Sequence, residues 1–337
     1  MLLLALSPAQ AEVVTDLYQG QVAVPDRSQS ALLQAASQAL SQVLVKASGS
    51  NEVLALPAIG AVLPDAVSQA QQFSYVRTGD PLAPLAARFE FDQGWVSDLL
   101  AQAGAPQWTA NRPSVLVWLV QDGPEGRQFV TRDSAPELIA ELEAGFARRG
   151  VPVRFPMFDL TDAQALTVDQ AWAMSTPSLQ QASARYRTQE ILAGRLSEQA
   201  DGRWFGDWAY LSAKNRLDRR IKPVALADFL HSGLALAVDD MAVRYAVRAG
   251  SMVDDGIHVS VSNVRTYADY AAVITWLEGL ELVRHAQVYA VRGDLLQLQL
   301  QARANAEQLK PLIELNRQLV PATRSGTADE LTYQWHN

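Results

Sequence analysis

The spacing of apolar residues predicts a buried strand, an amphipathic helix and a second strand near the middle of the chain. Residues 115–120 form an unbroken apolar run, which is typical of a strand covered on both faces and therefore central in its sheet. In residues 134–149 an apolar stripe recurs every fourth residue, at Leu138, Leu142 and Phe146. We expect a helix there, capped by Ser134, and a second strand at residues 151–155. Strand, helix and strand in this order predict a right-handed parallel crossover.

The N-terminal region predicts a strand, helix, strand, strand and helix. The strands are expected at residues 13–24, 73–76 and 86–91, and the helices at residues 26–49 and 92–104. Asp26 is the expected N-cap of the first helix, and Gly49 is its expected stop in the left-handed conformation. This order is that of a split βαβ unit of the ferredoxin type.

The C-terminal region repeats that order of elements without repeating its sequence. Strands are expected at residues 257–261, 282–291 and 296–300, with helices that begin after Thr266 and Asn305. In the third strand, leucines alternate with glutamines, which predicts one buried face and one wet face. Pro311 lies inside the last helix and is expected to delay or kink it.

The rest of the central region predicts a hairpin and a long helix. Residues 191–196 and 204–211 have strand character and flank Asp201 and Gly202, a turn pair typical of hairpins. A wide apolar face within residues 221–247 predicts one long helix.

Together these patterns predict a mixed α/β and α+β chain of three modules. Residues 12–108 and residues 251–337 are expected to form ferredoxin-like βαββα(β) modules. Residues 109–250 between them are expected to form a layered α/β domain, and residues 1–11 a signal-peptide remnant. A length of 337 residues suits two or three domains.

Composition narrows the compartment and the class of partner. The chain has 28 Lys and Arg against 36 Asp and Glu, a net charge of -8, and no dense basic block, which argues against nucleic acid as a partner. Cysteine is absent, which excludes disulfides, thiol nucleophiles and thiolate metal sites. A short apolar run at residues 2–6, followed by Ala9 and Ala11, predicts signal-peptide cleavage near Ala11 and a periplasmic protein. No apolar run approaches the roughly 20 residues of a transmembrane helix.

Two groups of side chains are candidates for ligand binding. Asp159 and Asp162 follow the second strand of the central domain, where ligands bind in α/β sheets, and paired acids can bind a cation or act in hydrolysis. The same spacing is also typical of a turn with a helix cap. Trp204 and Trp208 share one face of a strand, either as a platform for sugars or as packing against the long helix.

No catalytic, metal-binding or cofactor-binding set is predicted. The four histidines lack the spacing of a metal motif. His258 and His285 are expected on adjacent strands, where they can face each other as ordinary side chains rather than as metal ligands. The glycines of residues 123–126 do not follow the pattern of a phosphate or dinucleotide loop.

Several segments resemble an uncharacterised family. The motifs are Val43-Leu-Val-Lys-Ala-Ser-Gly49, Asn111-Arg-Pro-Ser-Val-Leu-Val-Trp118, Arg149-Gly-Val-Pro152, Asp159-Leu160 and Trp276-Leu-Glu278. They are similar to motifs of a secreted proteobacterial family, the domain of unknown function 2066. The resemblance covers most of the chain and implies export and the order of modules, but no reaction and no functional residues. The three-module arrangement is also loosely similar to the flagellar T-ring component and to the N-terminal domain of the Tol-system translocation protein.

The sequence therefore predicts a non-catalytic interaction or assembly protein of the cell envelope, with a protein partner of unknown identity. Small modules of this type leave strand edges that can accept a partner strand. The alternative is a cell-wall glycan binder or an acid-pair hydrolase that uses the central domain. The two predictions differ in whether Asp159, Asp162, Trp204 and Trp208 line an open cleft or serve as caps and packing.

Overall fold

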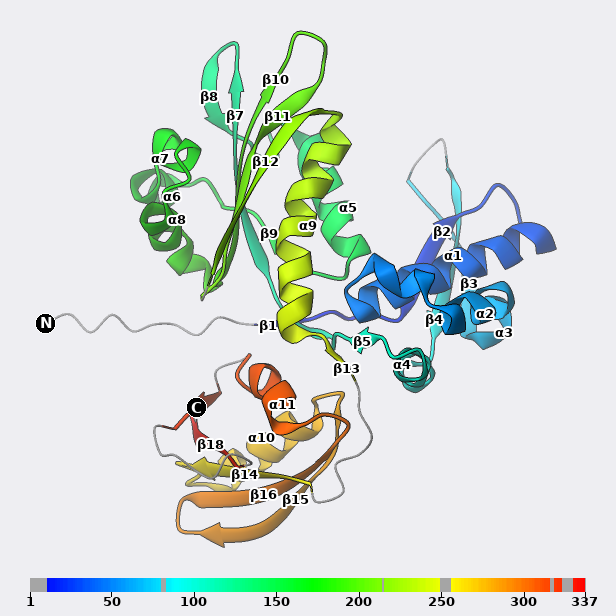
Figure 1. The fold of residues 1–337 in the computed structure, drawn as a ribbon, viewed down its shortest axis with the longest axis vertical. Helices are drawn as coiled ribbons and strands as arrows, with labels where there is room; N and C mark the ends of the chain where they lie inside the picture. The colour runs from blue at the N-terminus through cyan, green and yellow to red at the C-terminus, as the bar shows by residue number, and fades with distance from the viewer. Residues whose placement is uncertain are drawn as a thin grey trace, which may run out of the picture. The chain divides into compact units, whose positions relative to one another are not determined.

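The computed structural model describes residues 11–79, 83–213, 215–248, 256–315, 318–322 and 330–336. It confirms a mixed α/β chain with several small sheets (Figure 1). The chain divides into two compact units. The central unit comprises Arg112–Met241 with Met1–Glu12, and the flanking unit comprises Val13–Asn111 with Ala242–Asn337. Residues 1–10, nearly all of the predicted signal-peptide remnant, and the predicted boundary at residues 250 and 251 lie outside the described residues.

The sheet of the central unit is built around the predicted buried strand. Its order is β12–β11–β10–β7–β8, and β9 also pairs with β7. The pairing of β7 with β10 and with β9 is parallel, and the other pairings are antiparallel. The strands are β7 (Val115–Gly123), β8 (Gly126–Phe129), β9 (Val153–Arg154), β10 (Glu190–Glu198), β11 (Trp204–Leu211) and β12 (Arg216–Val224).

Helices cover both faces of this sheet (Figure 1). One face carries α5 (Pro136–Arg148) and α9 (Leu226–Tyr245), and the other carries α6 (Leu160–Ala165), α7 (Val168–Trp172), α8 (Thr176–Ser183) and the 3-10 turn η3 (Ala184–Tyr186). Trp118 packs on the α6–α8 side, where its indole N–H donates to Ser183 Oγ at 3.0 Å. Residues 115–120 are each at most 1% exposed, so this strand is covered on both faces as predicted.

Two expectations for the central unit were wrong in detail. Ser134 does not cap α5: the N-cap is Ala135, with Pro136 in the first turn, and Ser134 Oγ instead accepts from the Thr131 N–H at 2.9 Å. The strand expected at residues 151–155 is only two residues long. The long helix, Leu226–Tyr245, lies within the predicted range, and it is preceded by an unpredicted strand, β12 (Arg216–Val224).

Two arginines fix the end of α5. Arg112 is 0% exposed, and its Nη1 donates to the carbonyl oxygens of Arg149 at 3.2 Å and Gly150 at 2.9 Å. These carbonyls follow the last turn of the helix, where backbone acceptors lack helical partners and favour a cation. Arg149 in turn donates from Nη2 to Asp239 Oδ1 of α9 at 2.7 Å. The segment just before β7, the end of α5 and the middle of α9 are thereby linked.

Trp208 is clamped between two glycines on the α9 side of the sheet. Its ring is 0% exposed, and its indole N–H donates to the Phe229 carbonyl oxygen at 3.1 Å. A Cβ atom would lie 2.4 Å from the ring at Gly194 of β10 and 2.3 Å from it at Gly233 of α9. Only glycine lets the strand and the helix approach the ring this closely.

The N-terminal module of the flanking unit has the predicted order of elements. Its sheet is antiparallel with the order β2–β4–β3. The last of these strands in the chain, β4, therefore lies between β2 and β3, as in a split βαβ unit. The elements are β1 (Ala11–Val13), β2 (Gln19–Ala23), α1 (Gln29–Ser48), η1 (Asn51–Ala55), α2 (Pro57–Val62), η2 (Leu63–Asp65), α3 (Ala66–Gln69), β3 (Ala70–Arg77), β4 (Leu85–Phe91), α4 (Gln93–Gln102), β5 (Pro106–Gln107) and β6 (Asn111–Pro113). Gly49 ends α1 at φ 74 as predicted, but the N-cap is Ser28 and not Asp26.

The C-terminal module has the same βαββα core and an added hairpin. Its sheet order is β15–β16–β14–β18–β17, with β18 parallel to β14. The elements are β13 (Val247–Arg248), β14 (Ile257–Ser262), α10 (Tyr267–Glu278), β15 (Val283–Arg292), β16 (Leu295–Ala302), α11 (Ala306–Ile313), β17 (Leu319–Pro321) and β18 (Glu330–Trp335). Capping boxes at Thr266 and Asn305 confirm both predicted helix starts, and Pro311 lies within α11.

His258 and His285 do not face each other on adjacent strands. The strands β14 and β15 are not adjacent, because β16 lies between them. His258 is opposite Gln299, and His285 is opposite Gln301 and contacts Glu278 Oε1 at 2.7 Å. Chain order had suggested neighbours, whereas the split arrangement inserts the third strand.

A carboxylate links the two modules of the flanking unit. Glu281, in the turn before β15, accepts from the Tyr18 hydroxyl at 2.8 Å and from the Ala110 N–H at 2.7 Å. Gln107 Nε2 donates to the same carboxylate at 3.3 Å. Hydrogen bonds to a charged acceptor are stronger than neutral ones, so Glu281 holds both modules through three donors.

The Trp208 clamp predicts an unusual response to alanine. Alanine normally stabilises a helix relative to glycine. We expect Gly233→Ala instead to lower the free energy of unfolding by about 1–3 kcal/mol, because the added methyl overlaps a buried ring that cannot move. Urea denaturation followed by near-UV circular dichroism measures the change. Gly60→Ala in α2 is the control, since a Cβ there meets no atom within 4 Å. A Gly233→Ala protein as stable as the parent would contradict the clamp.

Candidate functional site

The candidate acids Asp159 and Asp162 are held in a network at the start of α6. Asp159 caps the helix by accepting from the Asp162 N–H at 3.0 Å, and its two oxygens bind Arg185 at 2.6 and 2.9 Å. Asp162 has a side chain only 2% exposed and accepts from the Phe158 N–H at 2.9 Å and from Arg185 Nη1 at 3.0 Å. The Tyr186 hydroxyl also donates to Asp162.

The network shifts the pKa values of Asp159 and Tyr186 further from neutral pH. The hydrogen bond from Arg185, helped by the Asp162 N–H, lowers the pKa of Asp159 to about 2. Burial and the hydrogen bond to Asp162 raise the pKa of Tyr186 to about 12. Neither group exchanges a proton near pH 7, so the network is built to hold the loop before α6, where Phe158 has a φ of 54°.

The two candidate tryptophans lie on the other face of the sheet. Trp208 packs against Phe229 of α9, with ring centroids 5.2 Å apart, and is fully buried. Trp204 is half-buried at the start of β11, opposite Val224 and beside a β-bulge. Because Asp159 and Asp162 belong to the α6–α8 side, the four predicted residues do not converge on one cleft. Asp159 and Asp162 make helix-cap and loop contacts, and Trp208 packs in the core. These are the structural roles that the sequence offered beside ligand binding.

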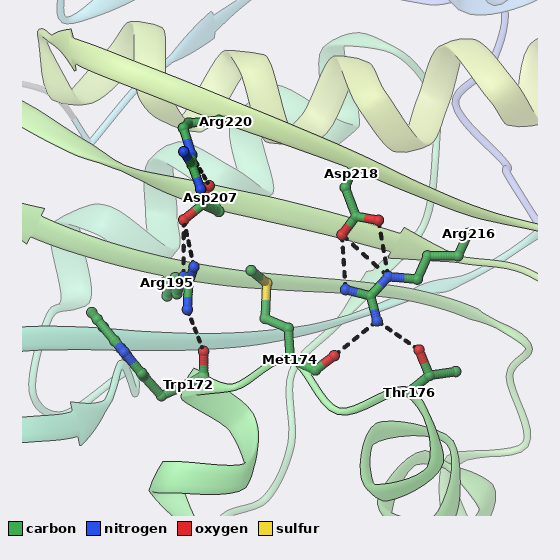
Figure 2. A network of polar contacts seen from close by, with 8 residues as sticks. All are labelled: Trp172, Met174, Thr176, Arg195, Asp207, Arg216, Asp218 and Arg220. Atoms are coloured by element: carbon green, nitrogen blue, oxygen red, sulfur yellow. Dashed lines mark hydrogen bonds and ion pairs between the residues drawn. The ribbon is translucent and has the colours of Figure 1, made fainter.

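A second polar network covers the α7 side of β10, β11 and β12 (Figure 2). Asp207 lies between Arg195 at 2.9 Å and Arg220 at 3.1 Å. Burial alone raises the pKa of Asp207, but the hydrogen bonds from these two arginines outweigh it and lower the pKa. Arg195 also donates to the carbonyl oxygen of Trp172, the last residue of α7, at 3.1 Å.

Arg216 continues this network along β12. It donates to the Met174 carbonyl oxygen at 2.9 Å and to Thr176 Oγ1 at 2.6 Å, and it pairs with Asp218 (Figure 2). Met174 has a φ of 49°, so the arginine fixes a left-handed turn between α7 and α8. The charges in this network bind one another and the backbone. No group of three or more His, Asp or Glu suited to a metal ion occurs in the described part of the chain.

A small cavity lies between α5 and α9 of the central unit. Its volume is about 240 Å³, below the several hundred Å³ of typical small-molecule sites. Its wall includes Glu141 and Arg148, which pair with each other at 2.9 Å. The cavity wall therefore contains one ion pair, together with Asp228 and His231 of α9.

The edge strand β3 of the N-terminal module exposes an aromatic side chain. Helix α1 packs on β2 and β4, and the core-facing side of β3 extends beyond it. Phe73 on that side is 46% exposed and stacks on Phe89, which is 0% exposed, with centroids 5.8 Å apart. Tyr75 packs edge-on to Phe73 at 6.1 Å and lies under Arg27 at 5.0 Å. The aromatic core thus continues to the open edge.

The sequence did not indicate that this strand is an exposed edge. The pattern of residues 73–76 predicts a strand, but it does not indicate that the strand lies at the edge of its sheet. Phe73 and Tyr75 alternate with Gln72 and Ser74, which is equally typical of an inner strand. The strand order, which places β3 at the rim while α1 packs on β2 and β4, leaves Phe73 exposed.

The pair of Asp159 and Arg185 predicts an acid-dependent loss of stability. The pKa of Asp159 falls from its ordinary 3.8 to about 2 on folding, so its contribution is complete above about pH 4 and disappears as the pH falls towards 2. We expect Asp159→Asn to flatten the dependence of the unfolding free energy on pH between 4 and 2. Arg185→Gln should return the pKa of Asp159 towards 3.8, as measured by NMR. An unchanged titration of Asp159 in Arg185→Gln would contradict this assignment.

A comparison with known protein families finds a match for part of the chain. Residues 11–109 match the family model described as Domain of unknown function (DUF8605). The expectation of an uncharacterised family is thereby confirmed for the N-terminal module, although the matching family is not the domain of unknown function 2066 named from the motifs. No curated protein matches the chain. None of the described helices has both the length and the apolar character needed to cross a membrane. The N-terminal module, including its β3 edge, is the part of the chain assigned to a described family.

Proposed function

We propose that this chain is a non-catalytic interaction or assembly protein of the cell envelope, and that a partner protein adds a strand to β3. The observation that carries the proposal is the β3 edge: an eight-residue strand with Phe73 46% exposed on the aromatic face of its sheet. An added strand would hydrogen-bond to the free backbone edge and bury Phe73 and Tyr75 under its own apolar side chains.

The contrast with β12 supports β3 as the interaction edge. Soluble proteins protect open edges with charged residues and proline. The edge strand β12 carries Arg216, Arg219, Arg220, Lys222 and Pro223 in nine residues. In β3 the only charged residue is Arg77 at its end, and there is no proline. The β3 edge is therefore both unprotected and aromatic, which is the combination that strand addition requires.

The alternative function, a glycan binder or acid-pair hydrolase in the central domain, has less support. Asp159 and Asp162 lie with α6, and Trp208 is buried under α9 on the opposite face. Export is part of the proposal and rests on the apolar N-terminus with Ala9 and Ala11.

Site-specific photo-crosslinking in living cells tests strand addition. We expect a benzoylphenylalanine at Ser74 of β3 to give a discrete adduct, and the same probe at Lys222 of β12 to give none. Phe73→Asp should abolish the adduct, because it places a charge in the apolar contact, whereas Phe73→Leu should retain it. In the purified complex, hydrogen exchange should slow at the amides of β3. Equal adducts at both positions, or no slowing at β3, would refute the proposal.

Fractionation tests the compartment. We expect osmotic shock to release the natively expressed protein together with a periplasmic marker, in a form whose N-terminus begins near Glu12. Retention with a cytoplasmic marker and an intact Met1 would contradict export.

A further inference from the structure

The outer face of the C-terminal sheet carries an aromatic platform among amides. Helices α10 and α11 lie on one side of this sheet (Figure 1). The buried side chains of β16 face them, at Leu296, Leu298 and Leu300. The alternating positions of β16 are glutamines and point to the other face. This outer face is defined here by His258, Gln287, Tyr289, Gln297 and Gln301.

A β-bulge turns Tyr289 onto this face. The register of β15 shifts between Val288, opposite Leu298, and Ala290, opposite Gln297, so Tyr289 is the additional residue. Its ring reaches across β16 to His258 of β14, with ring centroids 5.6 Å apart and planes at 88°. The side chain of Tyr289 remains 51% exposed. The Tyr289 ring spans the neighbouring strand β16 and packs edge-on against the His258 ring, which fixes its position as a platform.

The groups around the platform are mainly glutamine amides, with the Glu330 carboxylate opposite His258. Gln287 and Gln297 lie on the strands beneath Tyr289, and Gln301 lies further along β16. The neighbouring carboxylates are already bound, since Glu330 accepts from Ser260 at 2.6 Å and Glu278 contacts His285 at 2.7 Å. Each amide offers both donors and an acceptor, as a sugar hydroxyl does.

We propose that this face binds a neutral oligosaccharide, with a sugar ring stacked on Tyr289 and its hydroxyls bonded to Gln287 and Gln297. The C–H groups of the sugar pack on the aromatic ring, and its hydroxyl groups hydrogen-bond to the amides. One ligand can therefore contact both parts of the surface. Gln299 lies against Gly256 and takes no part in the assignment. The site is independent of β3 and of the candidate residues in the central unit.

NMR titration of the full chain with chitohexaose and cellohexaose tests the site. We expect saturable shifts at the amides of β15 and β16 with at least one of them, and about tenfold weaker binding in Tyr289→Ala, the scale of one stacking contact. Tyr289→Phe should retain binding, and Gln297→Ala should weaken it. The matched control is Tyr267→Ala, since Tyr267 is 83% exposed at the start of α10, which covers the other side of the sheet.

Each other outcome would overturn the proposal. If neither neutral sugar shifts these amide signals at 10 mM, the face does not bind neutral oligosaccharides. Tighter binding of a polygalacturonate hexamer would show that charge governs recognition. A Tyr289-dependent change of molecular mass in analytical ultracentrifugation, without sugar binding, would show that a second copy of the chain covers the face. Circular dichroism of the variants separates loss of binding from loss of folding.

Discussion

The central unit depends on the burial of one strand on both of its faces. Residues 115–120 of β7 are at most 1% exposed, and burying each such apolar side chain stabilises the fold by about 1.5–3 kcal/mol. Because both faces must be dry, helices are needed on each side, and both edges must be paired to satisfy the backbone. The pairing with β10 on one edge and with β8 and β9 on the other, and the two helical layers, follow from this requirement. Arg112 joins the segment just before the strand to the end of α5 through buried hydrogen bonds.

Charged side chains in the central unit mainly bind backbone groups and one another. Arg195 and Arg216 bind carbonyl oxygens at the end of α7, and Asp162 accepts a backbone N–H before α6. Such contacts order loops on the α6–α8 side that have few buried apolar residues of their own. The same residue types would serve in a catalytic or glycan site, so composition alone does not distinguish these roles. The partners and the geometry of each side chain distinguish them.

The flanking unit contains two modules with the same strand order and different exposed surfaces. In the N-terminal module α1 packs on β2 and β4, and Phe73 of the edge strand β3 is 46% exposed. In the C-terminal module the added strand β18 lies beside β14, and a bulge at the opposite edge strand turns Tyr289 outward. A common βαββα plan thus supports two distinct binding surfaces, because function resides in edges and faces that the plan leaves free. The proposed partner strand and the proposed sugar use separate modules and do not compete.

The sequence by itself determined the elements whose cause is local. Apolar runs and alternation located β7 and β16, and short-range chemistry located Gly49, Thr266 and Asn305 at helix ends, because caps depend on residues within one turn. It also supplied the candidates Asp159, Asp162, Trp204 and Trp208, but could not place the acids and the tryptophans on opposite faces. Only the tertiary structure decided which strands are neighbours, which edge is open and where a bulge turns a side chain. His258 and His285 are separated by β16, β12 extends the central sheet, and β3 is left uncovered. These outcomes depend on contacts between residues far apart in the chain, and such contacts leave no periodic mark within any one segment.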